Sequence, residues 1–156
     1  WESLGRMQRA LGFEFVVISR PRPRPPAGDL RWRWIPWSPR VEERISRCID
    51  VGLMPLVDEP FQRHKCATKI LQYMAGGLPF IATPIGVNRK IIDESGAGLG
   101  ADSETQWAEA IGALIHDQDL RHRLGRAGRR YCEEKYSARK WFPALLEILE
   151  RVRAAR

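Results

Sequence analysis

The chain has 156 residues, 44% hydrophobic and 29% charged, a composition that excludes a disordered protein. No apolar run approaches the roughly 18 residues of a membrane-spanning helix, and three widely spaced cysteines argue against a disulfide scaffold or zinc knuckle. The formal net charge is +7. From Arg121 onward eleven Lys and Arg residues stand against four Glu, so the surplus lies in the C-terminal region.

Strand and helix patterns alternate along most of the sequence. Short β-branched or apolar runs predict strands, and apolar residues three or four apart predict helices. The expected strands are 13–19, 30–36, 51–57, 78–83 and 95–101. The expected helices are 3–11, 39–48, 65–75, 88–93, 105–116, 120–135 and 138–153. Ser38 is the expected N-cap of the second helix, and residues 20–29 and 58–63 are expected to be loops.

This alternation predicts an α/β fold with a Rossmann-like parallel sheet flanked by helices, followed by C-terminal helices. We divide the chain into a Rossmann-like domain, residues 1–137, and a basic C-terminal helix, residues 138–156. The sequence begins at Trp1 without an initiator Met, and we interpret it as a fragment of a longer protein. In such folds ligands bind beyond the carboxyl ends of the strands, so the functional site is expected in the loops there.

The stretch after the third expected strand indicates an anion site. A loop leads into a helix that is expected to start at about His64–Cys66, and helix N-termini bind phosphate. Arg63, Lys65 and Lys69 add positive charge, and Lys65 and Lys69 would share one helix face at i,i+4 spacing. Gln72 lies two turns beyond Lys65, where its amide would reach ribose or sugar hydroxyls. The pattern therefore predicts a pyrophosphate site for a nucleotide-linked donor.

Three phrases carry a family resemblance: DVGLMPL at residues 50–56, KCATKILQYMAGGLPFIATPIGVNRKII at 65–92, and WAEAIGALIHDQDLRHRLGRAGRRYCEEKYS at 107–137. They resemble the C-terminal domain of GT-B glycosyltransferases of group 1, also called family four. The resemblance implies retaining transfer of a sugar from a nucleotide diphosphate sugar, with no separate cofactor. It also implies an N-terminal domain that holds the acceptor; that domain and the first strand of this one would lie outside the sequence.

One departure from the family affects the expected site. The family commonly carries two glutamates eight positions apart, and His64 and Gln72 stand there in this sequence. By position, His64 would face the sugar or phosphate and Gln72 the ribose. Cys66 is counted with the donor-binding loop, as a small packed residue rather than a nucleophile. Trp37 would stack on the nucleotide base or cover the sheet edge. No catalytic residue or metal site is expected in this half, and the fragment alone is expected to be inactive.

Other interpretations stay open. Lys65 and Lys69 also suit a solvated helix face, and the missing glutamate pair suits a non-catalytic binding module of the same fold. A nucleotide-sugar epimerase-like domain is a weaker alternative. The basic C-terminal helices suit either a solvated face or contact with an anionic membrane, and no base-reading module supports a nucleic-acid partner. The expected partners are a nucleotide sugar and an acceptor of unknown identity, either lipid-linked or a polysaccharide. The expected location is the cytoplasm, with peripheral contact at the inner face of a membrane.

Overall fold

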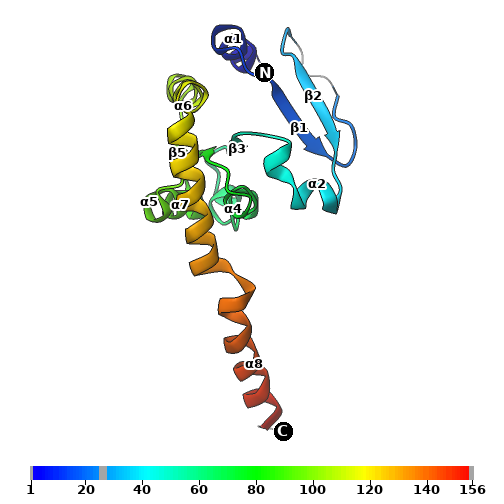
Figure 1. Ribbon diagram of the computed structural model, residues 1–156, viewed down its shortest axis with the longest axis vertical. Helices are drawn as coiled ribbons and strands as arrows, with labels where there is room; N and C mark the ends of the chain where they lie inside the picture. The colour runs from blue at the N-terminus through cyan, green and yellow to red at the C-terminus, as the bar shows by residue number, and fades with distance from the viewer. Residues whose placement is uncertain (1, 25–27, 155–156) are drawn as a thin grey trace.

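The computed structural model describes residues 2–24 and 28–154; Trp1, part of the expected loop 20–29 and the last two residues of the expected C-terminal helix lie outside that range. Figure 1 shows strands and helices alternating along the chain. The strands are β1 (Phe15–Ser19), β2 (Trp32–Pro36), β3 (Gly52–Met54), β4 (Phe80–Ala82) and β5 (Gly98–Gly100). The helices are α1 (Glu2–Leu11), α2 (Pro39–Glu43), α3 (Pro60–Arg63), α4 (Thr68–Ala75), α5 (Gly86–Ser95), α6 (Glu104–His116), α7 (Gln118–Tyr136) and α8 (Ala138–Ala154), with the 3-10 turn η1 (Ile45–Arg47).

Every strand pair in the described part of the chain is parallel, which confirms the predicted α/β class. β1 pairs with β2, and β3, β4 and β5 form a second sheet in that order. Parallel neighbours need crossover connections, and α4 and α5 supply them between the strands of the second sheet. The proline-rich stretch between β1 and β2 takes that place in the first sheet.

Among the described residues the parallel strands form two sheets, because β1 and β3 do not pair. A cavity of about 1310 Å³ separates the two sheets. Four consecutive residues of β1, from Phe15 to Ile18, border it. Successive side chains of a strand point to opposite faces, so a cavity on one face would meet alternate residues only. The cavity therefore runs along the edge of β1, opposite Val51 and Leu53 at β3.

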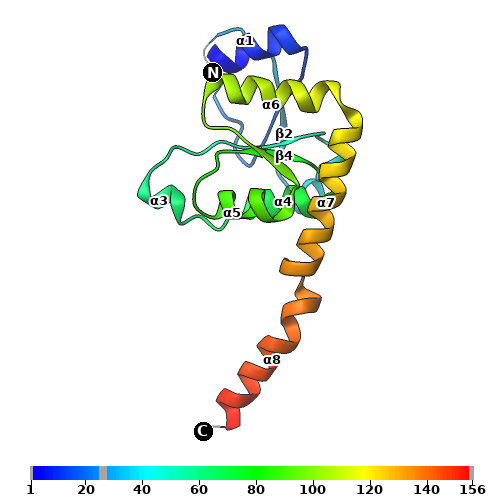
Figure 2. The ribbon, with the colours of Figure 1, turned by 90° about the vertical axis from the view of Figure 1, so that its left-hand side faces the viewer.

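Helix α1 joins the two halves of the molecule. Gln8, 2% exposed, donates to the Arg31 carbonyl over 2.6 Å and accepts from the Arg31 amide over 2.8 Å, which fixes α1 to the chain entering β2. On its other side Ser3 and Arg6 both donate to the Glu104 carboxylate of α6 over 2.7 Å. These hydrogen bonds hold the pKa of Glu104 below its ordinary value. In Figure 2, α1 lies along α6 at one end of the molecule.

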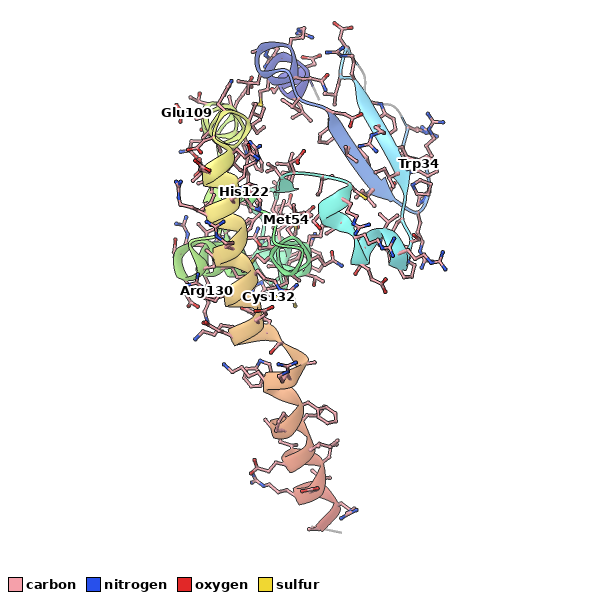
Figure 3. The ribbon with its side chains drawn as sticks, viewed as in Figure 1. Trp34, Met54, Glu109, His122, Arg130 and Cys132 are labelled. Atoms are coloured by element: carbon pink, nitrogen blue, oxygen red, sulfur yellow. The ribbon has the colours of Figure 1, made fainter. Side chains whose placement is uncertain are left out.

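The second sheet holds the main core. Phe80 and Ile81 of β4 are fully buried on opposite faces, so the sheet is covered on both sides. One core cluster joins Phe80 to Ile70 and Met74 of α4 and Ile91 of α5. The other joins Ile81 to Leu114 of α6 and Met7 of α1. Figure 3 shows Met54 inside the molecule, whereas Trp34 lies on the outer side of the first sheet.

Several predicted boundaries are wrong, among them those of the strand expected over 51–57, which spans only Gly52–Met54. The helix expected over 39–48 ends at Glu43 and continues as η1, although Ser38 caps it as predicted by accepting from the Val41 amide. The expected loop 58–63 contains α3, whose Pro60 stands at the first helical position. The helix expected from Lys65 starts at Thr68.

Helix α8 projects away from the rest of the chain (Figure 2). Its main packing partner in the described part of the chain is α7, and none of the residues 138–154 is buried. Its exposed apolar side chains are Trp141, Phe142, Leu145, Leu146, Ile148, Leu149 and Val152. Among the described residues, no helix combines the length and apolar character needed to cross a membrane.

Candidate functional site

The cavity between the sheets contains the candidate site at one end. Trp37 follows the carboxyl end of β2, and Pro55 follows that of β3. Lys69 and Gln72 of α4 border the same cavity. The structure thus brings together three of the residues predicted for the donor site, Trp37, Lys69 and Gln72, at strand ends where α/β folds bind ligands.

Helix α4 begins without a side-chain cap. Its N-cap is Ala67, which has the left-handed backbone angles φ 53° and ψ 28° and makes no capping hydrogen bond with its side chain. Ala67 is 1% exposed and belongs to the core cluster with Ile70, which explains why a small residue occupies this turn. A first turn without a side-chain acceptor leaves amide groups available for an anion.

The two predicted lysines do not share a helix face. Lys65 precedes α4, so the i,i+4 relation inferred from the sequence is wrong. Its ammonium lies 5.7 Å from the centroid of the Phe61 ring, and the residue is outside the cavity lining. Lys69 is in the first turn of α4, exposed, and borders the cavity. Of these two lysines, Lys69 borders the cavity and Lys65 does not.

The other predicted residues lie in the connection between α3 and α4. Arg63 ends α3 and makes a two-pronged ion pair with Asp58, at 2.6 and 2.8 Å. This hydrogen bonding lowers the pKa of Asp58 and raises that of Arg63. His64 Nδ1 is 2.7 Å from the Pro60 carbonyl oxygen, and His64 and Cys66 are exposed. None of the three borders the cavity, and their ligand roles stay predictions.

The sequence interpretation missed Glu42. Its Oε1 accepts from Gln72 Nε2 over 2.6 Å, and its Oε2 accepts from Trp37 Nε1 over 2.9 Å. Glu42 is half-buried and borders the cavity, and the Arg20 guanidinium lies 4.6 Å from the Trp37 ring centroid. Its place in the sequence could have indicated it, because Glu42 is on the first helix after the carboxyl end of β2, where α/β folds bind ligands.

Thr83 connects the loops at this edge. Its hydroxyl accepts from the Leu56 amide over 2.9 Å, and its carbonyl accepts from Asn88 Nδ2 over 3.1 Å. Asn88 is 1% exposed, so this hydrogen bond is inside the protein. The bonds fix the chain after β3 to the turn after β4 and to α5. In the described ranges, no three acidic, His or Cys side chains gather as metal ligands would.

Comparison with known proteins identifies relatives over much of this region. Residues 6–117 match the family described as Glycosyl transferases group 1. Spore coat protein SA of Bacillus subtilis is 32% identical over 83 residues, which are 51% of this chain and 22% of that protein. D-inositol 3-phosphate glycosyltransferase of Corynebacterium urealyticum is 33% identical over 88 residues, which are 55% of this chain and 20% of that protein. The matches span about a fifth of the length of either curated relative.

Proposed function

Because this chain belongs to the group 1 glycosyltransferase family, we propose that it binds the nucleotide diphosphate sugar of a glycosyl transfer reaction. The sugar would pass, with retention of configuration, to an acceptor held by a further domain, and the described half alone would be inactive. One observation carries the proposal: Lys69 and Gln72, one turn apart on α4, border the same cavity as Trp37.

The phosphates have a suitable place at the start of α4. The amide groups after Ala67 carry partial positive charge, and the Lys69 ammonium is in the same turn. Cleavage of the bond to the sugar leaves more negative charge on the diphosphate, so donors already aimed at it lower the barrier. Lys65 lies between α3 and α4 and does not border the cavity, so it would add positive charge near the phosphates without contacting them.

The base and the ribose would lie toward the first sheet. Trp37 offers a half-buried aromatic ring beside the cavity, and Gln72 offers an amide to hydroxyl groups. Arg63, His64 and Cys66 would contact the donor only after the connection between α3 and α4 moves toward the cavity. We assign no catalytic residue to this half of the enzyme.

The same cavity is also suited to one more strand. It runs along the edge of β1 and also borders Val51 and Leu53 at β3, and the strands within each of the two sheets are parallel. Neighbouring strands are about 4.8 Å apart, so one parallel strand between β1 and β3 would join the two sheets into one. We propose that polypeptide preceding α1 supplies this strand, which leaves the carboxyl end of the cavity for the donor.

Helix α8 supports a proposal of membrane contact. Its exposed apolar side chains include Trp141 and Phe142, and it also contains Arg139, Lys140, Arg151 and Arg153 beside two glutamates. A helix with an exposed apolar face and a surplus of cationic residues suits the surface of an anionic bilayer. The three cysteines of the chain, Cys48, Cys66 and Cys132, are free, which suits a reducing cytoplasm. The proposed location is therefore the inner face of a membrane in the cytoplasm.

Calorimetric titration with UDP, GDP and ADP and their glucose conjugates tests the proposed function. Saturable binding of at least one nucleoside diphosphate supports it. Absence of binding to all of them, by a longer chain that includes the segment before α1, favours the non-catalytic module instead.

A further inference from the structure

Glu42 connects opposite sides of the cavity. It belongs to α2, next to the first sheet, and its partner Gln72 belongs to α4, which covers the second sheet. Gln72 donates to one carboxylate oxygen over 2.6 Å and Trp37 donates to the other over 2.9 Å. Both donors are neutral, so the carboxylate is oriented by its neighbours without being neutralised.

The remaining hydrogen-bonding capacity of Glu42 is available to a ligand. Among the residues that the structure describes, no cationic side chain forms an ion pair with it. An ionised carboxylate has about four lone-pair sites, and Gln72 and Trp37 occupy one on each oxygen. A half-buried carboxylate that borders a cavity and has spare acceptor sites is suited to hydroxyl donors.

The charges of Glu42 and Lys69 determine how a donor would be oriented in the site. A diphosphate would be repelled by the Glu42 carboxylate and attracted by Lys69. Lys69 and Gln72 are three positions apart on α4, so their side chains leave the helix about 5–6 Å from each other. The phosphates of a bound donor therefore belong beside Lys69, and uncharged hydroxyl groups belong beside Glu42.

We propose that Glu42 accepts hydrogen bonds from a vicinal diol of the bound nucleotide sugar, with Gln72 and Trp37 as positioning residues that aim its two oxygens. The inference rests on the proposed function. The diol is that of the ribose or that of the transferred sugar, since both offer adjacent hydroxyl groups. The competing explanation is purely structural: Glu42 only holds α2 next to α4 through its hydrogen bond with Gln72.

Ratios of dissociation constants separate these explanations. The ribose ratio compares the dissociation constants of a nucleoside diphosphate and of its 2′,3′-dideoxy form, measured on the same protein. The glucose ratio compares the dissociation constants of the nucleoside diphosphate and of its glucose conjugate. The variants are Glu42→Gln and Glu42→Ala, and Glu43→Gln is the matched control on the same short helix, since Glu43 is exposed. Because each ratio compares two ligands on one protein, a smaller folded fraction cancels.

In the unmodified protein we expect one of the two ratios to be about tenfold in favour of the ligand that carries the diol. That ratio should fall to about one in both Glu42 variants and stay unchanged in Glu43→Gln. A change in the ribose ratio assigns Glu42 to the ribose, and a change in the glucose ratio assigns it to the sugar. Ratios that are the same with and without the Glu42 carboxylate overturn the proposal, even where every ligand binds more weakly. Failure of all nucleoside diphosphates to bind the unmodified protein would instead overturn the proposed function.

Discussion

Gly86 lies directly against the backbone of Arg63. Gly86 opens α5 with φ 50°, and a Cβ atom added there would overlap the Arg63 carbonyl oxygen. The connection from α3 to α4 therefore rests on the start of α5, without room for a side chain between them. Since this connection contains His64 and Lys65, the glycine sets how close those residues come to the start of α4.

Replacing Gly86 with Ala is expected to lower the free energy of unfolding by more than backbone strain alone. Gly96 provides the control, because its φ of 57° is similar but nothing lies within 4 Å of an added Cβ. A left-handed alanine costs about 1–2 kcal/mol, so Gly96→Ala should lower the melting temperature by about 3 °C. Gly86→Ala should lower it further and weaken nucleoside diphosphate binding; equal melting temperatures for the two variants would show that the connection adapts.

Removal of the Lys69 ammonium should weaken diphosphate binding selectively. We expect Lys69→Ala to raise the dissociation constant for a nucleoside diphosphate about tenfold, as for the loss of one charge-assisted contact, and Lys65→Ala combined with it to raise the constant at least as much. Lys90→Ala on α5, whose ammonium lies 3.9 Å from Glu94, is the control and should bind normally. An equal loss for the nucleoside without phosphates would contradict a phosphate contact.

The cysteines should differ in their rate of alkylation. Burial raises the pKa of the Cys132 thiol, so at pH 8 less of it is the reactive thiolate, and the residue is only partly accessible. Cys66 is exposed and directly precedes the turn at Ala67. With iodoacetamide and peptide mass mapping, Cys66 should be modified before Cys132. A saturating nucleoside diphosphate should slow Cys66 and leave Cys132 unchanged; equal slowing of both would indicate a global effect instead.

The exposed face of α8 should govern contact with lipid. We expect the chain to sediment with phosphatidylglycerol vesicles and much less with phosphatidylcholine vesicles, because cationic residues gain about 1 kcal/mol each near anionic lipid. Leu145→Glu with Leu149→Glu should abolish sedimentation, since both side chains are more than half exposed on the apolar face. The matched variant Glu147→Gln should sediment at least as well. Unimpaired sedimentation of the Leu145, Leu149 variant would place the contact elsewhere.

Local patterns predicted the order of the elements well. The apolar run around Phe80 and Ile81 and the cap at Ser38 report directly on burial and on local hydrogen bonding, so their strand and helix could be read from the sequence. The start of α4 could not, because Ala67 is a good helix former by propensity. Its left-handed turn comes from burial of its methyl group in the core, a tertiary effect.

The candidate site was predicted in part for the same reason. Lys69 and Gln72 stand in a recognisable motif on α4, and both border the cavity. Glu42 is thirty positions away from Gln72, and no local spacing relates the two. The separation of β1 from β3 also lay beyond the pattern, because a strand's sequence indicates burial but not its neighbour.

Side-chain signals of the site residues give the most direct test of a donor site at this place. In a ¹⁵N-resolved NMR titration with a nucleoside diphosphate, the Trp37 indole N–H and the Gln72 side-chain amide report on the cavity, and the Lys69 backbone amide reports on the start of α4. We predict that these three signals shift together and saturate with one dissociation constant, while the Trp34 indole, on the outer side of the first sheet, stays unchanged. Saturating shifts confined to other parts of the chain, or no shifts at any of the three, would contradict the account.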